Sequence, residues 1–212
     1  MPSYQQFNHR IGLLSDVFIA LSGLAVSDTS LLNGIDHVMD SLPIIVAGEK
    51  RSGSAKTANG LCNKGYCSSK GMYYYGVKLH ILAQRHPGTL PALRIAEITP
   101  AAVNDLTAAK EYLHEAKNMV IYADKIYLDA DWQTELAKQN IELRIPRKKQ
   151  KGDNLTGGDC VSTAVSRVRQ PIEAFFAWLI EKTDIQRASK VRSIAGLVSF
   201  VFARLASLFL CA

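Results

Sequence analysis

Residues 34–46 of the chain read GIDHVMDSLPIIV. Apolar and polar side chains alternate through the first part of this stretch, which then becomes continuously apolar. Alternation with a period of two predicts a β-strand that has at least one buried face. This predicted strand carries the acidic residue Asp40, whose carboxylate would project from the sheet.

The segments that follow have the composition of further strands. Residues 72–83 and 93–98 are rich in aromatic and β-branched side chains and are separated by a stretch that contains Pro87 and Gly88. This pattern predicts an antiparallel hairpin beside the first strand. A short apolar run at 119–123 predicts a buried strand, and we expect a further strand over 142–145. Residues 48–70 are rich in Lys, Gly, Ser and Asn, and we expect them to form a long surface loop.

Helices are expected between and after these strands. Asn104 is a suitable cap for a helix over 105–116, and the patterns at 129–139 and 163–182 predict two more helices. Strands that alternate with helices in this order predict an α/β domain with a mixed sheet. We expect one principal domain over residues 33–212, preceded by a short segment, 1–32. This segment is too short for an independent helix-turn-helix domain, and a remnant of a DNA-binding region is one interpretation of it.

The two ends of the chain bear on its location. Residues 1–10 are polar and lack the order of a signal peptide, so export is not expected. Residues 193–212 are apolar, with spacings of three and four that suit a helix packed on a core, and Arg204 interrupts them. We therefore expect a cytoplasmic protein with no membrane span, and a membrane anchor at this end is the alternative.

The chain is basic, with a formal net charge of +6 and a sequence pI near 9.1. Such a surplus favours polyanionic partners. Four basic residues lie in the connection that precedes the helix predicted over 163–182: Arg147, Lys148, Lys149 and Lys151. Cations in this position suit phosphate binding, since phosphate neutralisation dominates affinity for DNA. The alternative is a solvated loop with no partner.

Three acids stand where a metal site can be built. Asp40 lies in the first predicted strand, Asp124 follows a buried strand, and Glu173 projects from the helix over 163–182. Carboxylates from separate elements that meet at one point suit Mg²⁺, which prefers hard oxygen ligands. Taken singly, each acid has an ordinary explanation, because strand ends favour turn-forming Asp and helix surfaces favour Glu.

The local sequence around each acid resembles the DDE transposases of bacterial insertion sequences. Asp40 begins the run Asp-Ser-Leu-Pro, Asp124 lies in Ala-Asp-Lys-Ile-Tyr, and Arg169 precedes Glu173 by four residues, with an aromatic run after it. The stretches that begin at Lys64 and Tyr73 also look like the family. The resemblance covers roughly residues 35–209.

This resemblance implies a ribonuclease-H-like fold and a Mg²⁺-dependent reaction, in which Mn²⁺ can substitute. It implies that Asp40, Asp124 and Glu173 are both the catalytic residues and the metal ligands. The expected partners are the terminal inverted repeats of the element, target DNA and a second copy of the chain in a homodimer, which would act at the bacterial nucleoid.

Arg169 and Lys125 are further candidates for DNA contacts, with surface ion pairing as the alternative. Two other functions remain open for the whole chain. The first is an inactive DNA-binding remnant of a transposase, and the second is a structure-specific nuclease of the same fold that cleaves DNA without joining it.

Overall fold

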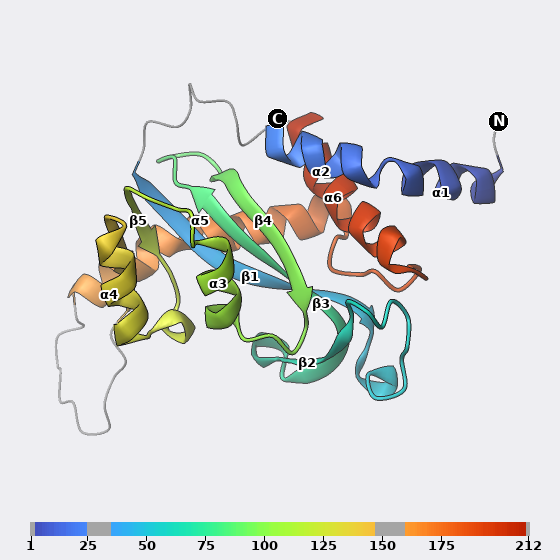
Figure 1. The fold of residues 1–212 in the computed structure, drawn as a ribbon, viewed down its shortest axis with the longest axis horizontal. Helices are drawn as coiled ribbons and strands as arrows, with labels where there is room; N and C mark the ends of the chain where they lie inside the picture. The colour runs from blue at the N-terminus through green and yellow to red at the C-terminus, as the bar shows by residue number, and fades with distance from the viewer. Residues whose placement is uncertain (1–2, 25–34, 147–159, 211–212) are drawn as a thin grey trace.

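The computed structural model describes residues 3–24, 35–146 and 160–210 of the chain. Within these residues six strands form one sheet (Figure 1). The strands are β1 (Asp36–Ala47), β2 (Asn63–Cys67), β3 (Met72–Gln84), β4 (Ala92–Pro100), β5 (Met119–Tyr122) and β6 (Ile141–Arg144). The helices are α1 (Tyr4–Leu13), α2 (Ser15–Leu24), α3 (Asp105–Tyr112), α4 (Ala130–Lys138), α5 (Cys160–Thr183) and α6 (Ile194–Leu210). Three short 3₁₀ helices are η2 (Glu49–Arg51), η3 (Ser68–Lys70) and η4 (Lys125–Tyr127).

The sheet is mixed, with β1 at its centre. One neighbour of β1 is β3, which is antiparallel to it, and the other is β5, which is parallel. The order is β2, β3, β1, β5, β6, and β4 also pairs with β3, beyond the stretch that β2 occupies. The prediction of an α/β domain with a mixed sheet is confirmed, and the arrangement is consistent with a ribonuclease-H-like fold.

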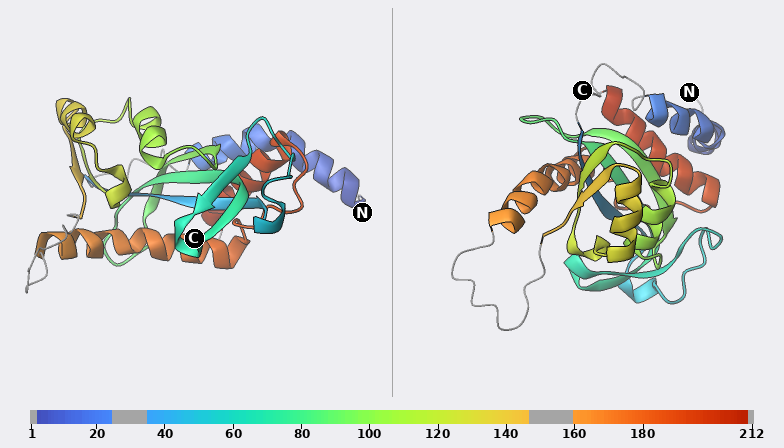
Figure 2. Two further views of the ribbon diagram at one scale, coloured as in Figure 1. Left: turned by 90° about the horizontal axis from the view of Figure 1, so that it is seen from below. Right: turned by 60° about the vertical axis from the view of Figure 1, so that its left-hand side comes forward.

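Helices cover both faces of the sheet, as the left view in Figure 2 shows for α5 on one side and α3 and α4 on the other. Val38, Leu42 and Ile44 of β1 pack in a core cluster with buried residues of α5 and α6. Met39 points to the opposite face, where it packs with residues of α3 and α4. Because β1 is covered on both faces, its position within the molecule is closely constrained.

Gly76 shows how closely β1 and β3 approach each other. A Cβ atom at this position would lie 2.1 Å from the backbone oxygen of Ile44. No side chain fits that space, so the two central strands pair in this register only with glycine here.

The strand β2 corrects the sequence-based expectation of one long loop over residues 48–70. Lys64 and Tyr66 are exposed, whereas Gly65 and Cys67 are buried, so β2 has the alternation of a strand. Small and charged residues concealed that alternation. The length of β3 explains the pairing, because β3 extends past β4 and leaves an edge that β2 fills.

The other predicted elements are confirmed with small differences at their ends. Asn104 caps α3 through a hydrogen bond from the backbone N–H of Leu106, as expected, and α3 ends at Tyr112 instead of 116. The helix predicted over 163–182 begins earlier, at Cys160. Helix ends commonly differ by a few residues because the last turn is held by few contacts.

The C-terminal helix α6 packs on the core, as predicted. Leu197, Val201 and Leu205 are fully buried in the same cluster as β1, and α2 packs against α6. Arg204 is accommodated by polar and aromatic contacts: its Nε donates to the backbone oxygen of Thr183 and its guanidinium lies over the ring of Phe200. None of the described helices is both long enough and apolar enough to cross a bilayer. The domain boundary at residue 32 stays a prediction.

Candidate metal centre

The register of two parallel strands places Asp40 beside Asp124. Asp36 pairs with Val120 and Val38 pairs with Tyr122. Two residues further along each strand, at the carboxyl end of β5, the positions are those of Asp40 and Asp124. The carboxyl ends of parallel strands are the usual place for a functional site in an α/β sheet; Asp124 follows such an end, and Asp40 lies next to it within the longer strand β1.

Arg169 of α5 joins the two acids. Its Nη2 donates to Oδ2 of Asp40 at 3.1 Å, and its Nη1 lies 3.7 Å from Oδ1 of Asp124. The arginine is 9% exposed, so this guanidinium is largely removed from solvent. Residues that are far apart in the sequence therefore meet at one point, with a cation between two carboxylates.

Asp40 is electrostatically unusual. Burial raises its pKa to about 6, the neighbouring carboxylate of Asp124 adds to the rise, and the Ser41 N–H and the Arg169 guanidinium oppose it. An acid in this position is stabilised in its charged form by a nearby positive charge. The site thus favours a cation close to Asp40.

Asp124 occupies the first position after β5. Its backbone is extended, and its side chain accepts a hydrogen bond from the N–H of Lys125, which begins the short helix η4. About half of the side chain is exposed to solvent, in contrast to Asp40. This acid combines the ordinary role of a cap with an oxygen that remains accessible from outside.

Glu173 lies one helical turn after Arg169 on α5. The helix is held on the sheet by Phe175, Phe176 and Leu179, which are buried as the sequence predicted, and by Ile172, which is also buried. Residues four apart share a helix face, so Glu173 projects from the same side as Arg169. Glu173 is exposed.

Asp40, Asp124 and Glu173 do not form a three-ligand metal site in this structure. Among the described residues, no group of three or more His, Cys, Asp or Glu side chains is close enough to hold a metal ion. The structure brings together Asp40, Asp124 and Arg169, and it leaves the assignment of Glu173 as a prediction. The donor set of Asp40 and Asp124 fits a hard divalent cation, because it consists of carboxylate oxygens that already lie around a positive charge.

The residues predicted to contact DNA differ in where they lie. Arg147, Lys148, Lys149 and Lys151 lie outside the described residues. Lys125 is exposed next to Asp124, and its contact with DNA stays a prediction. The structure places Arg169 against the acids, in a more buried position than a surface ion pair would occupy.

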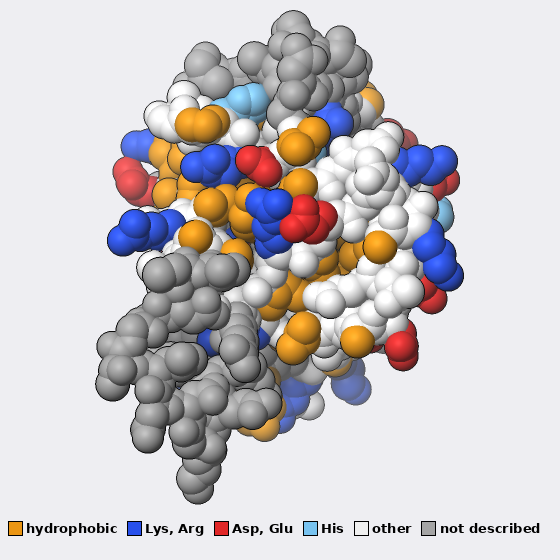
Figure 3. All heavy atoms as spheres, turned by 90° about the vertical axis from the view of Figure 1, so that its left-hand side faces the viewer, with side chains coloured by type: hydrophobic (Ala, Val, Ile, Leu, Met, Phe, Trp, Pro, Cys, Tyr) orange, Lys and Arg blue, Asp and Glu red, His pale blue; other side chains and the backbone are white. Residues whose placement is uncertain are grey.

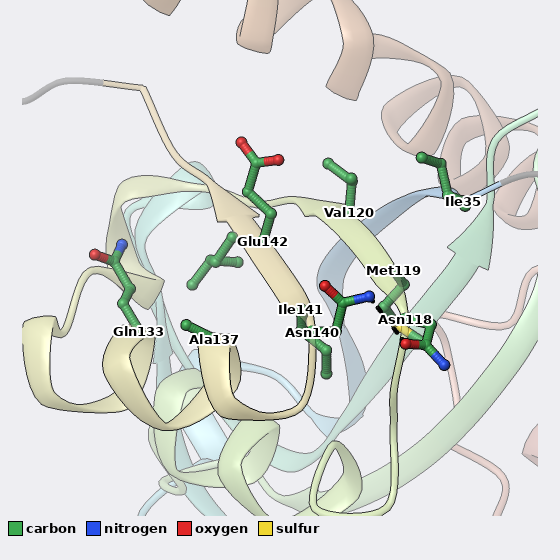
Figure 4. A pocket seen from close by; sticks show the side chains of 10 residues that line it. Ile35, Asn118, Met119, Val120, Gln133, Ala137, Asn140, Ile141 and Glu142 are labelled. Carbon is green, nitrogen blue, oxygen red and sulfur yellow. Dashed lines mark hydrogen bonds between the residues drawn. The ribbon is translucent and has the colours of Figure 1, made fainter.

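The end of the molecule that carries α4 and β5 is shown in Figure 3. Where described residues form this surface, basic and acidic side chains are interspersed. A pocket at the edge of the sheet lies between α4, β5 and β6 and is lined in part by Asn118, Val120, Asn140 and Glu142 (Figure 4). Asn140 donates to Asn118 there, and none of the three candidate acids lines the pocket.

Sequence reasoning missed a buried polar cluster on the face of the sheet that α3 covers. Lys78 donates to Oδ1 of Asp105 at 3.0 Å and to the backbone oxygen of Val103, so it points inward and not toward a ligand. His80 is fully buried, and its Nε2 lies 2.8 Å from the Thr99 hydroxyl. The alternating polar residues in a strand that is otherwise apolar were the available signal.

Comparison with known proteins gives one match. The family model described as Transposase DDE domain matches residues 29–193, well over half of the chain. Searches of curated proteins and of solved structures gave no match. The matched range contains all three candidate acids and Arg169.

Proposed function

Because the chain belongs to the Transposase DDE domain family, we propose that it is a DNA transposase that cleaves the ends of its insertion sequence and joins them to target DNA. The observation that carries this proposal is the contact of one arginine with two acids, Asp40 within β1 and Asp124 just after the end of β5. Carboxylates from separate elements that meet at one point can hold the divalent cations of a phosphodiester-cleaving site.

In this proposal Asp40 and Asp124 hold a divalent cation, Mg²⁺ or Mn²⁺, and Glu173 completes the ligand set for a second. The bound cations would act as Lewis acids on the attacking and the leaving oxygen of a phosphodiester. The protein's own contribution is to hold the two aspartates in register through β1 and β5. Arg169 limits their mutual repulsion before any cation binds.

The reaction we propose has two displacements at phosphorus. In the first, a water oxygen bonds to the phosphorus and the bond to the 3′ oxygen breaks, which leaves a 3′-hydroxyl at the end of the element. In the second, that hydroxyl attacks a phosphodiester of target DNA, and a target 3′ oxygen leaves. The DNA partners are the terminal inverted repeats and the target, and a homodimer would act on two ends, with the reaction located at the bacterial nucleoid.

The test uses the purified full chain and a supercoiled plasmid that carries the complete insertion sequence. With Mg²⁺ we expect nicks at the element ends and joined products, both absent with EDTA. Asp124→Asn and Asp40→Asn should each reduce cleavage at least about 100-fold, since each removes a carboxylate that would hold the cation at the reacting phosphate. Asp131→Asn is the matched control, because Asp131 is an exposed aspartate on α4, and it should retain activity.

The outcomes separate the proposal from its two rivals. Cleavage without joined products indicates a nuclease of the same fold. Plasmid binding without cleavage, with either Mg²⁺ or Mn²⁺, indicates an inactive DNA-binding remnant. Cleavage that survives Asp124→Asn would remove the assignment of the metal ligands.

A further inference from the structure

The hairpin of β2 and the start of β3 has an outer face with two tyrosines in contact, whose ring planes are inclined at 59°, and a lysine. Tyr66 and Tyr73 lie directly opposite each other in the antiparallel pairing, and their ring centroids are 5.0 Å apart. The ammonium of Lys64 lies 4.5 Å from the centre of the Tyr73 ring. Tyr66 is 52% exposed and Tyr73 is 48% exposed. Large aromatic side chains are seldom left this exposed in a pair without a partner to cover them.

The inner face of the hairpin is anchored. Gly65 packs so closely on Ala101 that a Cβ atom would lie 2.5 Å from the Ala101 backbone oxygen. Tyr74 and Cys67 are buried on the same inner side. At the turn, Lys70 donates to the side chain of Gln186, in the connection between α5 and α6. The outer face is therefore presented on a fixed platform.

The stretch of chain that contains β2 and leads into β3 is strongly basic. Residues 48–72 contain five basic residues and one acid, Glu49, which gives a net charge of +4 in a chain of +6. The five basic residues are all exposed: Lys50, Arg51, Lys56, Lys64 and Lys70. Among the described residues, no salt bridge pairs any of them with an acid. Charge complementarity thus favours a polyanion over a second copy of this basic chain.

We propose that the outer face of the β2–β3 hairpin binds single-stranded DNA, with bases stacked on Tyr66 and Tyr73 and a phosphate held by Lys64. Aromatic rings stack on unpaired bases of any sequence, and nearby cations bind the backbone. The choice of DNA as the polyanion rests on the proposed function. A single strand is exposed where a nicked element end separates from its complement, and the bases inside a duplex are already stacked on each other.

The hairpin is separate from the acids and lies on the same face of the sheet. Tyr73 and Ile81 project from one side of β3, and Ile81 pairs with Asp40. The stretch of β3 between them spans roughly 26 Å at the usual rise of a strand. In Figure 1 the hairpin lies at the end of β3 that is remote from β5. A DNA strand on the hairpin would thus extend well beyond the reacting phosphate.

The first experiment measures binding of the full chain to a dye-labelled single-stranded oligothymidine and to a duplex of equal length, both in EDTA. Tyr66→Leu and Tyr73→Leu keep an apolar cross-strand pair and remove the aromatic face. Each should weaken binding to the single strand about 5-fold to 100-fold and leave duplex binding unchanged. Tyr66→Phe and Tyr73→Phe retain the ring and should bind as the natural chain does. Urea unfolding of each variant checks that the hairpin is intact.

The second experiment identifies the contact directly. Photo-crosslinking of an oligonucleotide that contains 5-iododeoxyuridine, followed by mass spectrometry, should place the link on Tyr66 or Tyr73. Lys64→Gln should reduce the salt slope of single-strand binding by about 0.7, as the loss of one phosphate contact requires. Lys138→Gln, which changes an exposed lysine of α4, is the matched control and should not alter the slope.

The results that overturn the proposal are distinct from those that overturn the transposase function. If both leucine variants bind the single strand as tightly as the natural chain, or the crosslink lies on other residues, the hairpin is not the binding face. Because these measurements contain no metal, Asp124→Asn should bind normally in them. A chain that binds DNA through the hairpin and fails to cleave with Mg²⁺ would contradict the proposed reaction only.

Discussion

The Arg169 guanidinium lies between two carboxylates that belong to different strands. It is mostly buried, and its Nε has no hydrogen-bond partner among the described residues. When one member of such a group is removed, the remaining charges are left uncompensated. The resulting loss of folding free energy is larger than the stabilisation that the intact group provides. Arg169 is therefore a positioning residue that keeps Asp40 and Asp124 together when no divalent cation is bound.

We expect Arg169→Gln to lower the free energy of unfolding by about 1–3 kcal/mol in EDTA, because two carboxylates are then left facing each other. The partial exposure of Asp124 keeps the loss below that of a fully buried pair. Added Mg²⁺ should restore a large part of it by replacing the missing positive charge. Urea unfolding with and without Mg²⁺ measures both effects.

Arg167→Gln is the control for this change, since Arg167 is an exposed arginine on the same helix. It should alter stability by less than about 0.5 kcal/mol. An equal loss for Arg169→Gln with and without Mg²⁺ would show that the arginine does not stand in for a cation.

At the scale of elements, β3 connects the parts of the sheet. It pairs with β1 along one edge and with β2 and β4 along the other. One face of the strand carries the apolar residues that pack under α5 and α6, and the other carries the polar cluster of Lys78 and His80. This cluster ties β3 to β4 through Thr99 and to α3 through Asp105.

The cluster predicts a specific acid sensitivity. Burial lowers the pKa of His80 to about 4, the ammonium of Lys78 also lowers it, and the Asp105 carboxylate partly offsets both. Between about pH 6.5 and pH 4 the unfolded chain therefore binds a proton at this residue and the folded chain does not. In that window stability rises with pH, and the contribution of His80 is lost as the pH falls.

We expect His80→Gln to flatten the dependence of stability on pH in this window. The natural chain should lose up to about 3 kcal/mol more than the variant between pH 6.5 and pH 4, which corresponds to the size of the pKa shift. Urea unfolding at a series of pH values measures the difference. Parallel curves for the two proteins would show that His80 is not responsible.

At the scale of the whole molecule, residues from both ends of the described chain belong to one packed structure. The cluster that contains β1 includes α5 and α6, and Phe18 of α2 packs against it. The face under α3 and α4 has a second cluster, separated from the first by the sheet. Layers that share one sheet are expected to unfold together.

Leu205→Ala tests whether α6 is part of this unit. The side chain is fully buried, so its truncation should cost about 2–5 kcal/mol and lower the midpoint of a single transition. Ile194→Ala is the control on the same helix, where the side chain is 44% exposed, and it should cost less than about 1 kcal/mol. Tryptophan fluorescence and circular dichroism should give the same midpoint, and two separate transitions for Leu205→Ala would contradict a single unit.

The sequence by itself determined most of the elements, because the periodicity of apolar side chains is a local property. The strands around Asp40, over 72–83 and before Asp124 were readable in this way, as was the buried side of the helix that carries Glu173. The strand β2 was not readable, since its alternation uses glycine, cysteine and charged residues and its formation depends on the free edge of β3.

Only the tertiary structure decided which side chains meet. Asp40 and Arg169 are 129 residues apart, and no local pattern specifies the register of β1 and β5 or the placement of α5 that brings them into contact. The same holds for Tyr66 and Tyr73, whose rings come into contact through antiparallel pairing. Periodicity assigns a residue to a face, whereas contact across strands depends on register, and register is set by the packing of the whole core.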